Sequence, residues 1–464
     1  MEKLDFKTGN KILEEHKEFF ETQVTKSIDF RILQLNRLKK TVKKYEADIL
    51  EALYKDLGKC KMESFMTEIG YILMSITETM KKFKSWAKPQ KVSTPFYLMP
   101  SKSYKIYEPY GTVLILGPFN YPFQLVLEPL IGAIAAGNCA VVKPSELTPN
   151  VSFILNKIIG EAFNKKYIRC IEGDADVSAM LSSLKFDYIF FTGSESVGRK
   201  VMKAAAENLV PVTLELGGKS PVVVTDSAKL KIAAQRIIWG KLMNCGQTCI
   251  APDYILVDKK VKEKFIEQLK LAIKNFYGKD IIKSKDLAHI VNEKHFQRLE
   301  NILKKDEKYI VFGGKCDKEV LFIEPAILDI KDINAACMQE EIFGPILPVL
   351  AYDNIEQAVK IIKGKSKPLA LYIFNEENKL NKKLLKEISS GGVCINDTIN
   401  HIVNKNLPFG GVEKSGMGAY HGKYGFLTFS HCKSVLKKST RINMNFIFPP
   451  YNEKILKYIK KIMK

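Results

Sequence analysis

The strongest constraint on the fold is a regular alternation of short apolar runs with longer amphipathic segments, which begins at Gly111. The runs have the length of buried strands and the intervening segments have the length of helices; the runs lie at 112–116, 139–142, 168–171 and 188–191. Strands separated by helices predict a parallel, doubly wound sheet, because parallel neighbours need a crossover connection. Such sheets bind ligands beyond the carboxyl ends of their strands, so functional side chains are expected directly after these runs.

A second series of the same kind starts near Val212, and 464 residues exceed what a single hydrophobic core usually contains. The sequence therefore predicts an α/β protein with two sheet domains. The expected divisions are a helical N-terminus with the first sheet domain at 1–214, the second sheet domain at 215–400, a return segment with a final strand at 401–440, and a basic tail at 441–464. A polar and aromatic stretch at 94–107 predicts a protruding β-ribbon, separate from the first domain, that pairs with the final strand.

Charge and cysteine content exclude several functions. The 72 lysine and arginine residues against 51 acidic ones give a net charge of +21, but they are spread along the chain, so nucleic-acid binding is not expected. The first residues lack an apolar core and no apolar run could span a bilayer, which predicts a cytoplasmic protein with free thiols. Cys245 and Cys249 have no second ligand pair nearby, so no metal site is expected.

Cys249, in the segment GQTCIAP, is a candidate nucleophile because a thiolate is reactive where a base or a positive charge favours it. A buried structural cysteine is the alternative interpretation. Glu215 stands at a predicted strand end in ELGGKSP and is a candidate general base for activating water. The Gly-Lys-Ser of that segment is no phosphate loop, since Thr213 occupies the place of the required first glycine.

Two further segments follow predicted strands of the first sheet. Asn120, between prolines in GPFNYP, has a side-chain amide that can donate to a developing oxyanion, although asparagine and proline are also typical of turns. Gly193 and Ser194 lie where a strand leads into a helix, which offers backbone N–H groups for a pyrophosphate. The Gly-x-Gly-x-x-Gly pattern is absent there.

Together these segments resemble the aldehyde dehydrogenase superfamily over nearly the whole chain. The matching blocks are GPFNYP (117–122), VVKPSE (141–146), FTGSESVGR (191–199), ELGGKSP (215–221), GQTCIAP (246–252), EEIFGP (340–345) and PFGGVEKSGMG (408–418). The stretches MNCGQTCIAPDY and GGVCINDTINH are most similar to the class 3, fatty-aldehyde-type branch. The resemblance implies a Rossmann-like NAD(P)-binding domain within 1–214 and a catalytic domain at 215–400.

The resemblance also implies a role for each matching residue. Cys249 would be the nucleophile, Asn120 would form the oxyanion hole with the backbone N–H of Cys249, and Glu215 would activate the hydrolytic water. The positions that match cofactor-binding residues are Lys143 and Glu146 for the adenosine ribose, Gly193 and Ser194 for the pyrophosphate, and Glu341 and Phe343 for the nicotinamide ribose and ring. NAD is the expected cofactor and NADP is possible, because Glu146 would accept bonds from a ribose hydroxyl but repel a 2′-phosphate.

The expected reaction is oxidation of a medium or long aliphatic, or an aromatic, aldehyde to its carboxylic acid through a thioester. An acylating enzyme that passes the thioester to coenzyme A is the main alternative, and Glu215 argues against it. A cysteine hydrolase that uses His401 or His421, and a protein without activity, are further alternatives. Trp239 and Tyr121 are expected either to line the substrate entry or to belong to the core.

Two expectations concern assembly. The resemblance to class 3 implies a homodimer tied by the ribbon, with Phe96–Tyr107 pairing with Phe429–Leu436. Beyond Pro450, apolar and lysine residues segregate at helical spacing, so the tail predicts a basic amphipathic helix capped by Asn452. That helix either packs on its own or a partner subunit or lies on a membrane surface.

Overall fold

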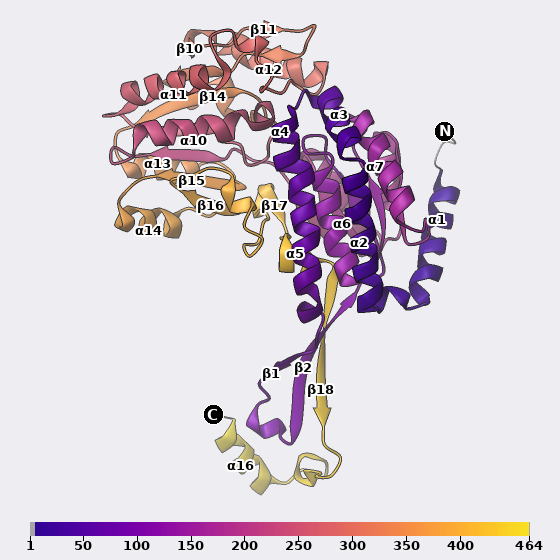
Figure 1. Cartoon of the computed structure of the whole chain (residues 1–464). Coiled ribbons are helices and arrows are strands. Elements are labelled where there is room, and N and C mark those ends of the chain that lie inside the picture. Colours follow the sequence, from indigo (N-terminus) through magenta and orange to yellow (C-terminus); the bar gives the residue numbers. More distant parts are fainter. Residues whose placement is uncertain (1–4, 464) are drawn as a thin grey trace.

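The computed structural model describes residues 5–463 and has the predicted α/β fold with two mainly parallel sheets (Figure 1). The first sheet comprises, in spatial order, β17 (Gly416–Met417), β7 (Val212–Glu215), β6 (Tyr188–Thr192), β3 (Thr112–Leu116), β4 (Cys139–Lys143) and β5 (Ile168–Cys170). Its neighbours are parallel except β17, which runs antiparallel to β7. Numbered in chain order, the five parallel strands are arranged 3-2-1-4-5, the order of a dinucleotide-binding sheet.

Both faces of this sheet are covered by helices. Alternate residues of each strand point to opposite sides, and they belong to two different core clusters. Val113 and Ile115 belong to one core cluster, and Leu114 and Leu116 belong to another. The helices on the first side are α6 (Gln124–Ala136) and α7 (Pro149–Ala162), and those on the second side are α1 (Phe6–Glu21), α8 (Ala175–Ser183) and α9 (Glu195–Ala206). The central residues of the strands are therefore mostly apolar on both faces, as expected for a sheet covered on both sides, and polar residues such as Lys143 and Glu215 lie at strand ends.

The N-terminal segment is helical, as expected, and most of it forms a further layer over α6 and α7 (Figure 1). The helices of this layer are α2 (Ile28–Lys44), α3 (Glu46–Leu57) and α5 (Gly70–Trp86). Between α3 and α5 the chain forms the short helix α4 (Lys61–Ser64) and a π-helical turn, η2 (Phe65–Ile69). Isolated π-helical turns frequently occur at functional sites, so residues of this connection are candidates for a functional role.

The second sheet has seven strands, and only the edge strand β10 is antiparallel. Its order is β10 (Ile310–Phe312), β13 (Ala326–Ile330), β14 (Ile346–Tyr352), β9 (Tyr254–Asp258), β8 (Pro221–Val224), β15 (Ala370–Phe374) and β16 (Gly392–Ile395). Its helices are α10 (Leu230–Leu242), α11 (Lys262–Tyr277), α12 (Glu293–Lys305), α13 (Ile355–Lys363) and α14 (Asn378–Glu387), and a small hairpin joins β11 (Cys316–Asp317) to β12 (Phe322–Ile323).

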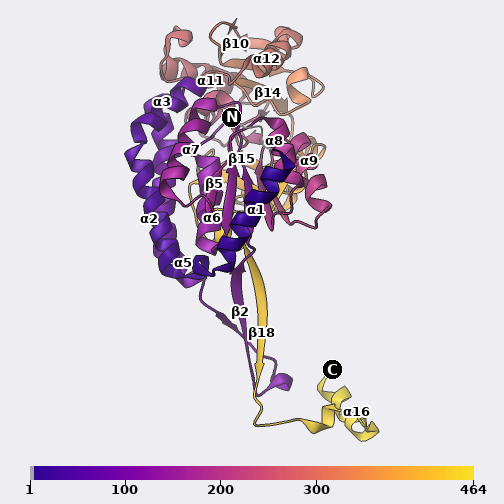
Figure 2. The same ribbon diagram turned by 90° about the vertical axis from the view of Figure 1, so that its right-hand side faces the viewer.

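A three-stranded ribbon protrudes from the first domain and contains β1 (Gln90–Val92), β2 (Ser101–Pro109) and β18 (Ser430–Lys438) (Figures 1 and 2). The expected pairing of the two distant segments is present, but both strands begin later than predicted. Pro100 has no N–H to donate to a ladder, and residues Phe96–Leu98 before it form one 3-10 turn. Similarly, Phe429 is the C-cap of the helix α15 (Gly422–Thr428), so β18 begins at Ser430.

The predicted tail helix is present as α16 (Glu453–Ile462) beyond the far end of the ribbon (Figure 2). Asn452 caps it, since its Oδ1 accepts a hydrogen bond from the backbone N–H of Lys454 at 2.8 Å. Within the described range 5–463, no helix is long and apolar enough to cross a bilayer.

Candidate active site

Four of the sequence-predicted residues lie at the carboxyl edge of the first sheet. Lys143 ends β4, Glu215 ends β7, and Gly193 and Ser194 directly follow β6. Asn120 follows β3, the strand next to β6. The sheet reverses its winding direction between β3 and β6, so these residues surround the switch point where such folds bind ligands.

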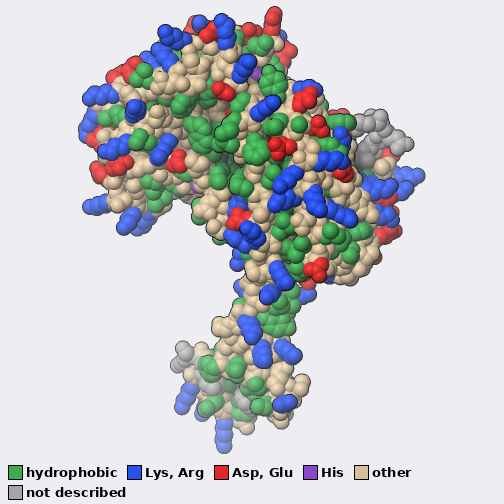
Figure 3. Space-filling view, in the orientation of Figure 1, with side chains coloured by type: hydrophobic (Ala, Val, Ile, Leu, Met, Phe, Trp, Pro, Cys, Tyr) green, Lys and Arg blue, Asp and Glu red, His purple; other side chains and the backbone are tan. Residues whose placement is uncertain are grey.

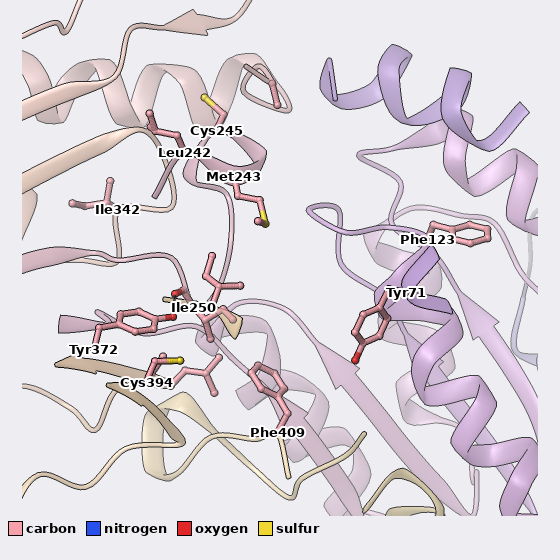
Figure 4. Packing of buried hydrophobic residues seen from close by; sticks show 14 of the residues in the cluster. Tyr71, Phe123, Leu242, Met243, Cys245, Ile250, Ile342, Tyr372, Cys394 and Phe409 are labelled. Carbon is pink, nitrogen blue, oxygen red and sulfur yellow. Dashed lines mark hydrogen bonds between the residues drawn. The ribbon is translucent and has the colours of Figure 1, made fainter. Parts of the chain in front are cut away.

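Cys249 lies on the segment between α10 and β9, which belongs to the second sheet domain. The segment begins with three consecutive residues in left-handed backbone conformation: Asn244 (φ 52°), Cys245 (φ 54°) and Gly246 (φ 77°). Gly246 has no space for a side chain, since a Cβ there would lie 2.3 Å from the carbonyl oxygen of Gly344. Figure 4 shows Cys245 and Met243 of this segment among buried apolar residues. Strained backbone of this kind is typical of functional loops.

Cys249 is partly exposed, and its surroundings favour the neutral thiol. Burial is the main cause that raises the pKa of the Cys249 thiol, and the nearby carboxyl groups of Glu341 and Glu215 raise it further. The thiol therefore needs a positive charge or a base beside it before it becomes a nucleophile.

Glu215 is a buried carboxyl group that has no hydrogen-bond partner in the described structure. Its side chain is 2% exposed, and neither carboxyl oxygen has a hydrogen-bond partner among residues 5–463. Burial raises the pKa of Glu215 well above its ordinary value. A buried polar group that lacks a partner is rare in folded proteins and marks a candidate functional group.

The loop that carries Asn120 is tied to the loop that carries Cys249. The Tyr121 hydroxyl lies 2.8 Å from the Thr248 hydroxyl, which joins the residue after Asn120 to the residue before Cys249. Asn120 is buried, and its side-chain amide makes no hydrogen bond with any atom of the described part of the chain. That amide is therefore available as a donor, on a loop that is hydrogen-bonded to the residue before Cys249.

The two residues predicted to hold an adenosine ribose form an ion pair. Lys143 Nζ donates to Glu146 Oε2 at 2.6 Å; the lysine is buried, whereas the Glu146 side chain is 39% exposed. Beyond β6, the Gly193 N–H donates to the Glu215 carbonyl oxygen at 3.0 Å, and the Ser194 hydroxyl caps α9. The first turn of α9 thus lies at the same edge as this pair, with the backbone N–H groups that favour an anion.

Glu341 and Phe343 approach the same edge from the second domain. A Cβ on Gly217 would lie only 2.0 Å from Glu341 Oε2, so the glycine lets this carboxyl group lie against the backbone that follows Glu215. Burial raises the pKa of Glu341 to about 8. Phe343 has a positive φ of 48°, and its ring contacts that of Phe119 with centroids 5.7 Å apart.

The two histidines of the hydrolase alternative are bonded elsewhere. His401 Nδ1 lies 3.1 Å from the sulfur of Cys394, and His421 stacks on Phe409. Burial lowers the pKa of His401 to about 4 and that of His421 to about 3, so both are neutral near pH 7. Neither contacts Cys249 by a hydrogen bond in the described structure, which removes the support for this alternative.

Sequence reasoning missed three polar residues around Asn120. Lys59, Glu68 and Asn244 are buried and form a hydrogen-bonded group at this loop. No motif identifies them; Glu68 lies in the π-helical turn, which periodicity does not predict. Tyr121 proves to be buried and bonded to Thr248, so it belongs to the core, and Trp239 is partly buried against the same core.

A dinucleotide-binding strand order with these side chains at its carboxyl edge defines an oxidoreductase with a Rossmann-like domain. More specifically, the chain belongs to the aldehyde dehydrogenase family, whose model matches residues 4–435. This confirms the resemblance inferred from the seven sequence blocks.

Similar proteins agree with this assignment. The chain is 54% identical to a 4,4′-diaponeurosporen-aldehyde dehydrogenase of Staphylococcus aureus, over 97% of each chain. It is 42% identical to aldehyde dehydrogenase family 3 member H1 of Arabidopsis thaliana, over 98% of this chain and 95% of the relative. It is 43% identical to a canine aldehyde dehydrogenase described as dimeric and NADP-preferring, over 90% and 92%. The class 3 resemblance is thereby confirmed.

The fold is also that of a solved relative. A structure of the substrate-bound state of Staphylococcus aureus AldH superimposes with a TM-score of 0.96 at 53% identity, covering 98% of this chain and 99% of the other. The two-sheet architecture and the ribbon therefore belong to a known arrangement.

Proposed function

We propose that this enzyme oxidises aldehydes to carboxylic acids with NAD(P)+ through a thioester on Cys249. The observation that carries the proposal is the pairing of a partly exposed thiol with a buried carboxyl group, Glu215, whose oxygens have no partner in the described structure. One group suits attack on a carbonyl carbon, and the other suits later activation of water.

In the first step the Cys249 thiol gives its proton to a base, the thiolate sulfur bonds to the aldehyde carbon, and the carbonyl oxygen becomes an oxyanion. The Asn120 amide and the backbone N–H of Cys249 would stabilise that oxyanion, and such a donor contributes about 3–4 kcal/mol. When bound, the nicotinamide cofactor supplies the acceptor for the hydride that leaves the same carbon. The product on the protein is a thioester of Cys249.

In the second step Glu215, in its carboxylate form, removes a proton from water while the water oxygen bonds to the thioester carbon. The carbon–sulfur bond then breaks, which releases the carboxylic acid and returns Cys249 to the resting state. The apolar surroundings that raise the pKa of Glu215 also make its carboxylate a stronger base than a solvated one.

The residues present fit a dinucleotide cofactor. Lys143 and Glu146 together offer a donor and acceptors to ribose hydroxyls, and the N-terminus of the twelve-residue helix α9 offers N–H groups to a diphosphate. Thr192, which ends β6 before this helix, has a buried hydroxyl with no partner among the described residues. Glu341 and Phe343 would hold the nicotinamide riboside from the second domain.

Production of NADH from an aldehyde panel, with and without coenzyme A, tests the function. The panel should include short, medium and long aliphatic, aromatic and polyene aldehydes, since the Staphylococcus aureus relative is named for the polyene aldehyde 4,4′-diaponeurosporen-aldehyde. We expect turnover without coenzyme A and release of the free acid. Strict dependence on coenzyme A would instead establish the acylating alternative.

Cofactor preference should follow the charge of Glu146. Its carboxylate would accept a bond from the 2′-hydroxyl of NAD and repel the 2′-phosphate of NADP, so we expect a lower KM for NAD. Glu146→Ala should raise the KM for NAD about tenfold, which is the effect of one lost charged hydrogen bond. The ratio of the KM values for NADP and NAD should therefore fall. The canine relative prefers NADP, so a lower KM for NADP in the wild-type enzyme would contradict the assignment of Glu146.

We further propose that the enzyme is a homodimer joined through its ribbon; the name of the canine relative describes that protein as dimeric. Large apolar side chains are exposed at the far end of the ribbon, among them Phe96, Tyr97 and Leu436. A second copy of the ribbon would cover such a surface.

We propose that α16 binds an anionic membrane surface. Leu456 and Tyr458 are exposed, Lys454, Lys457, Lys460 and Lys461 are exposed as well, and the helix lies away from the two sheet domains (Figure 3). Basic amphipathic helices of this length lie in the membrane interface and do not cross it. Figure 3 also shows both apolar and basic side chains on the ribbon.

Truncation after Pro450 should reduce co-sedimentation with phosphatidylserine vesicles at low salt, because it removes both the apolar face and the lysines. Activity on a short soluble aldehyde should stay unchanged. Sedimentation without vesicles gives the mass of both proteins and separates membrane binding from loss of the dimer. Equal vesicle binding by truncated and full-length protein would exclude the tail as an anchor.

A further inference from the structure

The backbone carbonyl of Asn120 accepts two hydrogen bonds from different parts of the chain. Lys59 Nζ donates at 2.9 Å from the connection between α3 and α4, and Asn244 Nδ2 donates at 2.8 Å from the cysteine-bearing segment. A carbonyl with two short donors has both acceptor positions occupied, so the orientation of its peptide plane is fixed.

Lys59 is itself held on the side of the N-terminal helices. It is 1% exposed, and its ammonium group forms an ion pair with Glu68 at 2.5 Å. The other oxygen of Glu68 accepts from the N–H groups of Phe123 and Gln124, both at 3.0 Å, at the start of α6. The ammonium also lies 4.0 Å from the centre of the Tyr121 ring. Lys59 therefore fixes the loop at Asn120, and Glu68 fixes it at its C-terminal end, where α6 begins.

Asn244 provides the corresponding contact from the second domain. Its backbone N–H donates to Glu63 Oε1 at 2.7 Å, and its Nδ2 donates to the Gln247 carbonyl as well as to that of Asn120. Its own Oδ1 is buried without a partner in the described structure, so the side chain acts through its donors. The left-handed backbone of Asn244, at φ 52°, directs the amide toward the Asn120 loop.

We propose that Lys59 and Asn244 are positioning residues that hold the Asn120 carbonyl so that its side-chain amide is aimed at the oxyanion formed above Cys249. This inference rests on the proposed role of Asn120. An oxyanion donor is effective only when it is aligned before the reaction, since the free energy needed to reorient it during the step would offset its stabilisation of the oxyanion. Asn244 lies on the same segment as Cys249, so it sets donor and nucleophile relative to each other.

Stability alone does not account for a buried lysine at this place. A buried ion pair contributes little net stability, because desolvation offsets its attraction, and an apolar pair of similar volume is often equally stable. The Lys59–Glu68 pair instead directs three bonds onto one loop, to the carbonyl of Asn120 and the N–H groups of Phe123 and Gln124. These three bonds restrict the conformation of the loop that carries Asn120.

The test is a double-mutant cycle on the rate of the first NADH turnover, which reports thioester formation. Lys59→Met and Asn244→Gly are compared singly and in an Asn120→Ala background; glycine accepts the backbone conformation at position 244 without strain. Each single variant should slow this step about tenfold or more, and Asn120→Ala about a hundredfold or more. In the Asn120→Ala background, adding either change should alter the rate less than about twofold, because the amide to be aligned is gone.

Lys39→Met is the matched control. Lys39 is a partly buried lysine of the same helical layer, and its Nζ donates to Thr77 at 2.7 Å without contact to the Asn120 loop. It should leave the first turnover at the wild-type rate, and the KM for NAD should not change in any single variant. Asn244→Gly keeps Lys59 in place, so the inference can be tested even where Lys59→Met does not fold.

The outcomes distinguish the positioning role of Lys59 and Asn244 from the oxyanion role of Asn120. If Asn120→Ala slows the step but the other changes multiply independently with it, or leave the rate at wild type, Lys59 and Asn244 do not act through Asn120 and the inference fails alone. If Asn120→Ala leaves the rate unchanged, the proposed oxyanion role of Asn120 fails as well.

Discussion

Replacing Cys249 with alanine should lower aldehyde oxidation by about 10⁴-fold or more, which is the usual effect of removing a covalent nucleophile. No other thiol can substitute, because Cys245 points into the core on the same segment and is fully buried. Cofactor binding should survive, since the residues expected to hold the cofactor lie on other segments. Steady-state NADH production and calorimetric titration with NAD check the two parts separately.

Cys432→Ala is the control for this variant. Cys432 is exposed on β18, far along the chain from the candidate site, and a thiol reagent would modify it readily. The control should keep full activity and should still be inactivated by the reagent, with protection by aldehyde and cofactor together. Substantial NADH production by pure Cys249→Ala protein would exclude the thioester mechanism.

Much of the fold could be predicted because it depends on local patterns. The strands at Thr112–Leu116 and 139–142 are short, mostly apolar and separated by helical segments, which predicts a parallel sheet with both faces covered. The parallel arrangement in turn places Lys143 and Glu215 at one edge, since both end their strands. The sequence predicted a strand end at each residue, but it was wrong to begin the second series near Val212, because β7 belongs to the first sheet and only tertiary pairing with β6 shows this.

The support around the site could not be predicted in the same way. Lys59 and Asn120 are 61 residues apart, and only the packing of helices against the loop brings them within a hydrogen bond. Likewise, the positive φ values of Asn244 and Phe343 arise from tertiary contacts, because non-glycine residues rarely adopt them on local preference. Single-sequence patterns contain no information on such contacts.

Boundaries were the weakest part of the prediction, and prolines explain one of them. The alternation of aromatic and polar residues after Phe96 resembles a strand, yet the strand starts at Ser101, after Pro100. The tail helix was located correctly from its spacing and from Asn452, but its place beyond the ribbon depends on the path of residues 439–452. The spacing of apolar residues predicts that a helix forms, but the position of the helix depends on the path of the chain before it.

Glu215→Gln should produce about one equivalent of NADH per active site in a rapid burst and then nearly stop. Glutamine has almost the same shape but cannot take up a proton from water, so the thioester should form and then accumulate. Steady-state turnover should fall by about 10²–10⁴-fold, the usual contribution of a general base. Stopped-flow absorbance gives the burst, and intact-protein mass spectrometry should find the acyl group on Cys249.

Wild-type turnover should also depend on pH through the same residue. Burial raises the pKa of Glu215, and the base must be ionised, so deacylation should be lost as pH falls through that raised pKa and should recover as pH rises. Glu215→Gln should lose this dependence. A small nucleophile such as hydroxylamine should restore turnover in the variant, because it attacks the thioester without help from a base.

The size of the burst distinguishes two roles for Glu215. The carboxyl group lies near Cys249 and affects the pKa of its thiol, so Glu215 is also placed to remove the thiol proton. If it served only that step, Glu215→Gln would slow the burst itself and hydroxylamine would not rescue turnover. A full burst with rescue assigns Glu215 to water activation, whereas unchanged steady-state turnover would remove it from the mechanism.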